Sequence, residues 1–354
     1  MSEENHITAL SDDGAQPARQ MRQTFRRTLK VCLALSFALV CAVLCTSVIG
    51  SQRLPAYPAL CSIFTGGDYA CGLTEEQRAI LFEIRLPRIL LAGAVGASLA
   101  AAGAGYQALL RNPLAEPYLL GISNGAAVGT MLALVFFGAH EWSRPLMAFA
   151  GAMSATLLVY RLARGRAGAT PERLILSGVI VTTFLSSAIV FITTLMDATR
   201  VRSFTFWLLG DLSGSTRSLL AMALVAAICG TIVLALHARS LNLLMLGERD
   251  AFDLGVEVER VRVTIFLTAS LLVGASVAAS GSVGYVGLVV PHLVRLSAGS
   301  DNRMTIPSAS LLGALFVIVA DTIARTIIAP RELPVGAITA LIGAPLFIYL
   351  LRRG

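Results

Sequence analysis

Residues 87–109 read PRILLAGAVGASLAAAGAGYQAL, and after Arg88 this stretch contains no charged side chain. About 20 consecutive apolar residues cross the hydrocarbon core of a bilayer as an α-helix, so this stretch is long enough to be a membrane span. Its many glycines and alanines leave a smooth surface on which another helix can pack closely. Backbone groups in lipid must be satisfied within each segment, and we therefore predict an all-α membrane protein.

Apolar stretches of similar length recur along the chain, which is 56% hydrophobic and only 14% charged. Ordinary soluble domains are roughly 25% charged. We expect about ten spans, of which the eighth is short, so the protein is predicted to be polytopic. The expected spans are residues 31–50, 87–109, 118–138, 146–163, 174–195, 218–237, 261–280, 283–297, 306–327 and 335–351.

Basic residues predict the orientation of these spans. Arg26, Arg27 and Lys30 precede the first span, and Arg352 follows the last one. Because basic residues are enriched on the cytoplasmic side, both termini are expected to be cytoplasmic. The polar residues 1–30 are expected to form a disordered cytoplasmic tail, and residues 31–354 the transmembrane domain.

Several classes of function are excluded by residues that the chain lacks. The net charge of +7 comes from short arginine clusters without interleaved aromatic residues, so we expect no nucleic-acid partner. The one lysine, Lys30, has no glycine-rich loop around it and cannot serve a nucleotide phosphate site. His292 has no second ligand nearby in the sequence. We therefore expect no catalytic residue, no metal site and no cofactor bound by this chain.

Two alternative functions stay open but are disfavoured. An intramembrane enzyme needs paired acids or a metal motif within its spans, and an ion-coupled secondary transporter needs acids near the membrane midplane. Asp321 is the only acid clearly within an expected span.

Three other patterns predict local structure. Gly121, Gly125 and Gly129 recur every four residues and are expected to share one helix face, which serves helix packing or lines a substrate pathway. Cys61 and Cys71 lie in a polar loop predicted to be outside the cytoplasm, where oxidation is permitted. We predict a disulfide between these two cysteines.

The polar segment at about 239–259 lies between the sixth and seventh spans. Glu248 and Asp250 suit the start of a short helix, and Gly255 suits a position just past its end. Phe252 and Leu254 are apolar residues flanked by charges, among them Arg249. The segment is either a solvated loop helix or a surface on which another protein docks.

Residues 80–351 contain a series of short motifs, in this order: RLPR (85–88), GAGYQ (103–107), RNPLAEP (111–117), LGISNGA (120–126), GYVGLVVPH (284–292), Ala320-Asp321 with Ala324-Arg325, LPVG (333–336) and GAP (343–345). This ordered set resembles the FecCD-type permease family of vitamin B12, haem and ferric-siderophore importers.

This resemblance implies a type II ABC importer permease fold in a bacterial inner (plasma) membrane. It implies a second permease copy as partner, most simply in a homodimer, and two ATPase subunits that carry ATP and Mg on the cytoplasmic face. A periplasmic or extracellular binding protein would deliver a metal chelate, which the sequence does not identify. Within the 239–259 segment, the expected ATPase-docking residues are Glu248, Arg249, Asp250, Phe252, Leu254 and Gly255.

The resemblance also suggests a docking site for the binding protein at Arg85, Arg88 and Arg325, which fall at the outer ends of their expected spans. The alternative is structural. In that case Arg325 pairs with Asp321 one helical turn away, and Arg85 and Arg88 anchor the chain at the membrane interface.

Overall fold

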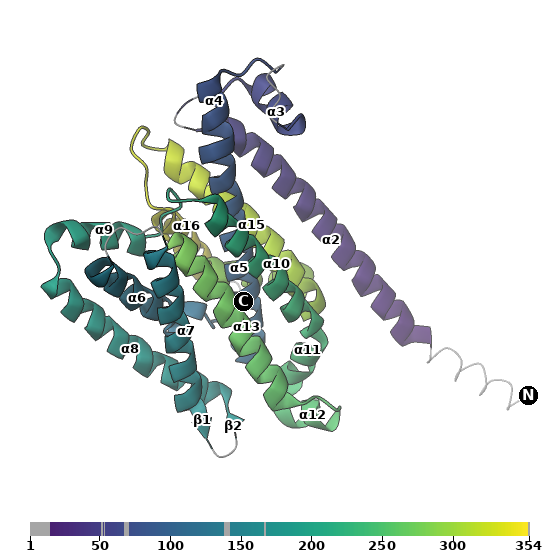
Figure 1. Ribbon diagram of the computed structural model, residues 1–354. Coiled ribbons are helices and arrows are strands. Elements are labelled where there is room, and N and C mark those ends of the chain that lie inside the picture. Colours follow the sequence, from purple (N-terminus) through teal and green to yellow (C-terminus); the bar gives the residue numbers. More distant parts are fainter. Residues whose placement is uncertain are drawn as a thin grey trace, which may run out of the picture.

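The computed structural model describes residues 15–352, except for 51, 53, 67–70, 138–141 and 166–167. This part of the chain is almost entirely helical, with one two-stranded hairpin (Figure 1). The helices before the hairpin are α2 (Ala15–Val48), α3 (Ala56–Phe64), α4 (Glu75–Ala79), η2 (Ile80–Arg85), α5 (Leu86–Leu109), η3 (Pro117–Leu120), α6 (Ile122–Phe136) and α7 (Ser143–Ala163). The hairpin is β1 (Arg164–Gly165) and β2 (Gly168–Ala169). After it come α8 (Pro171–Leu195), α9 (Ala198–Leu208), α10 (Arg217–Leu236), α11 (Ala238–Leu246), α12 (Glu248–Asp253), α13 (Val258–Ser280), α14 (Val286–Ala298), α15 (Asn302–Thr326) and α16 (Val335–Leu351).

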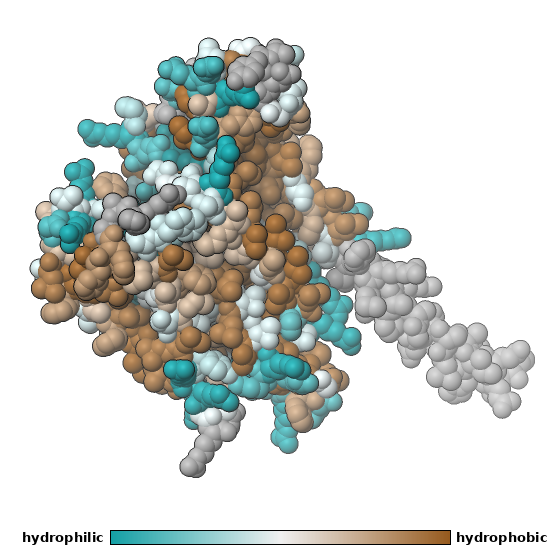
Figure 2. Space-filling view, in the orientation of Figure 1, coloured by the Kyte–Doolittle hydropathy of each residue, from teal (hydrophilic) through white to brown (hydrophobic). Residues whose placement is uncertain are grey.

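Within the described ranges, seven helices are long and apolar enough to cross a membrane, and α6, α14 and α16 are shorter apolar helices. Together they coincide with the ten expected spans, including the short eighth one. In Figure 2 hydrophobic residues form a broad band across the visible face of the bundle, between more hydrophilic regions above and below it. The prediction of an all-α, multi-pass membrane protein is confirmed.

The first helix is longer than expected. Helix α2 begins at Ala15, so the prediction of disorder is wrong for residues 15–30. Glycine and proline, the residues that commonly end a helix, are absent between Ala18 and Val48. Residues 1–14 of the predicted tail lie outside the described residues.

Helix α5 is the centre of the bundle. It packs against α10, α13, α14 and α15, and nearly all of its residues are buried. A Cβ atom on Gly96 would collide with the carbonyl of Gly313 in α15, and one on Gly103 with the carbonyl of Gly287 in α14. These glycines therefore let helix backbones touch directly. Helices α6, α7 and α8 form a second group, joined to the first by contacts between α7 and α13.

The predicted glycine face of α6 is only partly correct. Cβ atoms on Gly125 and Gly129 would meet the carbonyls of Gly151 and Met147 in α7, so both residues serve helix packing. Gly121 lies before α6, with φ of 75°, and faces Val181 and Thr182 of α8. The spacing of four residues predicted one continuous helix face, but the helical backbone is interrupted between Pro117 and Gly121.

Two irregular segments, residues 110–121 and 281–285, contact each other within the bundle. The Tyr118 hydroxyl donates to the Val283 carbonyl (2.6 Å) and accepts from the Val283 amide (2.9 Å). The Glu116 carboxylate accepts a hydrogen bond from the Tyr285 amide (3.2 Å). Side chains of one segment thus satisfy backbone groups of the other, where no helix can do so.

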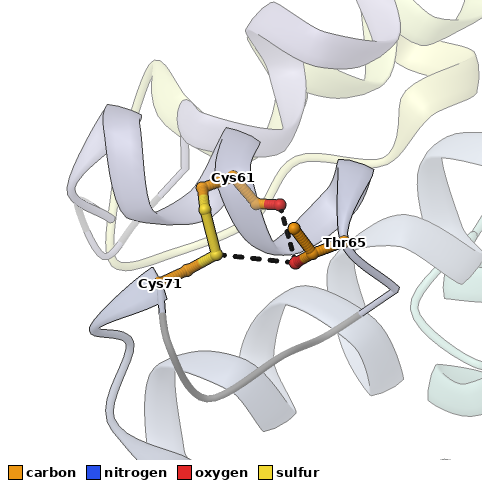
Figure 3. Close-up of a disulfide and its surroundings, with 3 residues drawn as sticks. All are labelled: Cys61, Thr65 and Cys71. Carbon is orange, nitrogen blue, oxygen red and sulfur yellow. Dashed lines mark hydrogen bonds between the residues drawn. A yellow bond between two sulfur atoms is a disulfide. The ribbon is translucent and has the colours of Figure 1, made fainter.

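The predicted disulfide between Cys61 and Cys71 is present (Figure 3). It connects α3 with the residues that precede α4, and the two Cα atoms are 5.8 Å apart. The Thr65 hydroxyl donates to the Cys61 carbonyl (3.0 Å) and lies 3.5 Å from the Cys71 sulfur. The bond therefore ties α3 to the segment that leads into α4.

We expect a maleimide to label four cysteines in unreduced, SDS-denatured protein, namely Cys32, Cys41, Cys45 and Cys229. Reduction should raise the number to all six. When both Cys61 and Cys71 are replaced with serine, the number of labelled cysteines should be the same with and without reduction. The replacement should also lower the free energy of unfolding by about 2–3 kcal/mol. Mass spectrometry counts the labels, and labelling of six cysteines without reduction would contradict the prediction.

Candidate functional site

The bundle has two polar ends, each with a group of charged residues. We call the end that carries α3 and α4 the α3 end, and the end that carries α12 and the hairpin the α12 end (Figure 1). The predicted docking residues are divided between them: the three arginines lie at the α3 end and the 239–259 segment at the α12 end.

At the α3 end, Asp321 of α15 lies between two arginines. Arg88 of α5 donates through Nε to Asp321 Oδ1 (3.0 Å), and Arg325 of α15 pairs through Nε with Asp321 Oδ2 (3.0 Å). Arg88 also pairs through Nη1 with Glu332 (2.7 Å) in the connection between α15 and α16. The network therefore fastens the start of α5 to the end of α15 and to the segment that follows it.

Arg85 lies next to this network but binds the backbone. Its guanidinium donates to the carbonyls of Ser47 (2.9 Å), Val48 (3.1 Å) and Gln52 (2.7 Å). The carbonyls of Ser47 and Val48 lie in the last turn of α2, where the helix has no partner for them, and Gln52 lies in the segment that follows. Arg85 thus caps α2 from η2.

The structure brings Arg85, Arg88 and Arg325 to one end of the bundle, but it buries all three. Their exposed fractions are 4%, 7% and 5%. The pair of Arg325 with Asp321, which belongs to the structural alternative, is present. The docking role of the three arginines stays a prediction, and their burial favours the structural alternative. Glu332, whose side chain is 41% exposed, is the member of this network that reaches solvent.

At the α12 end, the segment 239–259 contains the short helix that was predicted. Helix α12 has Glu248 and Asp250 in its first turn, and Gly255 follows its end with φ of 82°. Ala251 is fully buried, so this face attaches α12 to the bundle. Phe252 and Leu254 are 71% and 63% exposed, which leaves two apolar side chains in solvent beside the exposed charges of Arg249 and Asp250.

A groove of about 700 Å³ lies beside this helix, between Phe252 and the first turn of α13. Charged side chains line much of it, among them Arg249, Glu257 and Arg260. Glu248 differs from its neighbours because it is turned towards the bundle and pairs with buried Arg262 (2.6 Å). Arg262 was not among the predicted site residues, because an arginine in the first turns of a span resembles a topology-setting charge when its partner Glu248 lies in another helix.

His292, which lies inside an apolar run, is a packing residue. The ring of His292 packs against that of Phe347, with centroids 6.2 Å apart. In the part of the chain that the structure describes, no three His, Cys, Asp or Glu side chains are placed to share a metal ion.

Comparisons of this chain with known proteins agree on one class, the membrane-spanning subunits of transporters. The sequence model of the FecCD transport family matches residues 36–353. The chain is 42% identical to a cobalamin import system permease protein of Halobacterium salinarum, over 85% of this chain and 80% of that one. It is 41% identical to a hemin transport system permease protein of Yersinia pestis, over 77% and 83% of the two chains. Among solved structures, a metal-chelate type ABC transporter in an inward-facing conformation matches with a TM-score of 0.80 and 32% identity, covering 92% of this chain and 99% of that one.

Removing Asp321 should destabilise the protein strongly. In Asp321→Ala, two buried arginines lose their shared carboxylate, and breaking a buried ion pair costs about 3–5 kcal/mol. The matched control is Glu257→Ala, because Glu257 pairs with Arg260 (3.1 Å) while both side chains are largely exposed. An exposed pair contributes about 0–1 kcal/mol.

Unfolding by SDS titration in detergent micelles measures both variants. Equal losses of stability in Asp321→Ala and Glu257→Ala would show that the network at the α3 end is not structural.

Proposed function

The chain belongs to the FecCD transport family, and from this we propose that it is the membrane-spanning permease subunit of an ABC importer for a metal chelate such as an iron–siderophore, cobalamin or haem. Two relatives, a cobalamin permease and a hemin permease, support this substrate class. The fold of this chain, a type II importer permease with ten apolar helices among the described residues, agrees with that of the solved transporter. The observation that carries the proposal is the exposed pair Phe252 and Leu254 on α12.

Phe252 and Leu254 favour a protein partner at the α12 end. Large apolar side chains that protrude into water beside charges are typical of interface anchors. We propose that an ATPase subunit receives them in a groove of its own, while Arg249 and Asp250 set the register. Two such subunits, one on each permease copy, would bind ATP and Mg. We assign the ATP site to the partner because Lys30, the one lysine of this chain, lies in no phosphate-binding loop.

With this assignment, the protein lies in a bacterial inner membrane and its α12 end faces the cytoplasm. Both chain termini would then be cytoplasmic, as the basic residues suggest. The α3 end would face the binding protein, in a compartment that permits the Cys61–Cys71 disulfide. Docking there would involve the surface around Glu332, with the buried arginines holding it in place.

A second copy of the chain is the expected partner within the membrane. The small-residue faces do not supply that interface, because Gly96, Gly103, Gly125 and Gly129 are already used within the subunit. Helix α8 offers a better surface, since its side chains Phe184, Val190, Phe191 and Leu195 are all about two-thirds exposed or more. We propose that α8 lies at or near the contact between the two copies.

An ion-coupled transporter or an intramembrane enzyme finds less support. Asp321 is held between two arginines at the α3 end, so its carboxylate is not free to bind an ion or a proton in the way that such mechanisms require.

Replacing Phe252 with aspartate should abolish association with the ATPase while leaving the permease folded. The side chain is exposed, so the isolated chain loses little, whereas loss of a central anchor typically costs an interface about 2–4 kcal/mol. Co-purification from detergent-solubilised membranes measures the association. A matched control is Phe64→Asp, because Phe64 is about as exposed but lies at the end of α3, at the opposite end of the bundle. Normal recovery of the ATPase with Phe252→Asp would contradict the docking assignment.

The function itself is tested by uptake into proteoliposomes that contain the permease, its ATPase and the binding protein. We expect uptake of cyanocobalamin, haemin or ferrichrome that stops with orthovanadate and continues with a protonophore. Uptake that a protonophore abolishes and vanadate does not would refute an ATP-driven importer.

A further inference from the structure

A buried arginine, Arg262, lies directly behind α12. It belongs to the second turn of α13, and its side chain is only 5% exposed although it is at a polar end of the bundle. The two arms of its guanidinium form separate ion pairs. Nη2 pairs with Glu248 (2.6 Å) at the start of α12, and Nη1 pairs with Glu259 (2.8 Å) within α13. Arg262 therefore bridges the short helix and a membrane span.

The two carboxylates extend this bridge to other helices. Glu248 also lies 3.9 Å from Nη2 of Arg111, which follows the last turn of α5. Glu259 accepts a hydrogen bond from the hydroxyl of Tyr160 in α7 (2.8 Å). We call these five residues, Arg111, Tyr160, Glu248, Glu259 and Arg262, the Arg262 cluster. Its formal charges balance, with two arginines and two glutamates.

The cluster continues into the interior of the bundle. The ring of Tyr160 packs against that of Phe266 in α13 (5.8 Å between centroids), and Phe266 packs against Tyr106 of α5 (5.9 Å). On the outside, Gly168 of the hairpin lies against Glu259, because a Cβ atom there would be 2.9 Å from Oε2. Elements α5, α7, α12, α13 and the hairpin thus meet around one guanidinium.

The backbone around α12 explains why such a bridge is needed. The helix has six residues and lies between Gly247, with φ of 152°, and Gly255, with φ of 82°. Glycines at both ends leave the connecting backbone with wide conformational freedom. The orientation of α12 relative to the spans therefore depends on side chains, namely buried Ala251 and the pair between Glu248 and Arg262.

We propose that Arg262 is a positioning residue that couples α12 rigidly to α5, α7 and α13, so that a displacement of α12 by a bound ATPase moves these spans. This inference rests on the proposed function. It assigns Glu248 to the permease side of α12 and leaves Phe252 and Leu254 to the partner. Arginine suits the role because its planar fork can hold two carboxylates at once, and a contiguous ion-pair network can carry coupling between sites.

The first test uses the permease alone, in lipid nanodiscs, and needs no ATPase. Two variants cut the bridge from opposite sides: Arg262→Gln, and Glu248→Gln, which preserves the pair between Arg262 and Glu259. In both variants we expect amide hydrogen exchange in residues 247–256 to become about tenfold faster. A tenfold change lies within the usual range of coupling free energies between two sites. The control is Arg200→Gln, which removes an exposed pair with Asp197 (3.1 Å) at the start of α9. Exchange that is unchanged in Glu248→Gln would overturn the positioning role.

The second test measures substrate transported per ATP hydrolysed, in proteoliposomes with the ATPase that co-purifies with the wild-type chain. Glu248→Gln should retain the ATPase and lower this ratio by about tenfold, and Arg262→Lys should recover only part of the loss of Arg262→Gln. A normal ratio in Glu248→Gln would overturn the coupling role. Loss of ATPase binding in Glu248→Gln would also overturn it, because Glu248 would then contact the partner and not Arg262. If the wild-type chain binds no ATPase at all, the proposed function fails. The coupling role then fails with it, and the exchange experiment still decides whether Arg262 holds α12.

Discussion

Lipid offers no water to an unpaired backbone amide or carbonyl, and this constraint governs the whole structure. It explains why the described chain is almost wholly helical. It also explains the two places where helices are interrupted inside the bundle. There the phenol of Tyr118 and the carboxylate of Glu116 bind backbone groups of the 281–285 segment. At and just after the end of α2, Arg85 donates to three carbonyls in the same way. In these places a polar side chain replaces the partner that a continuous helix would give the backbone.

The periodic and compositional features were readable from the sequence because they depend on local chemistry. Apolar length located the ten spans, and the pattern from Glu248 to Gly255 located α12 together with its end. The Cys61–Cys71 pair followed from its short separation and its place in a polar loop. Each of these needs only residues that are near one another in the chain.

Features that depend on distant partners could not be predicted in the same way. The burial of Arg88 requires Asp321 and Glu332, which are more than 200 residues away in the sequence. Whether Gly125 packs or lines a pathway depends on Gly151 in the neighbouring helix. Helix α9, which crosses no membrane, was also missed, because its mixed sequence has no apolar run. Arg262 was missed because its two partners lie on either side of a chain reversal.

The network at the α3 end has a consequence for biosynthesis. The helix that carries Arg88 enters the membrane early, whereas its partners Asp321 and Glu332 follow only after 233 and 244 further residues. During that interval Arg88 has neither carboxylate, but near a helix end its side chain can remain at the membrane interface and so avoid the roughly 2.5–3.5 kcal/mol that a charge costs at the bilayer centre. The ion pairs that fasten α5 to α15 therefore form only after α15 has been inserted. Completion of the α3 end is thus a late event in synthesis.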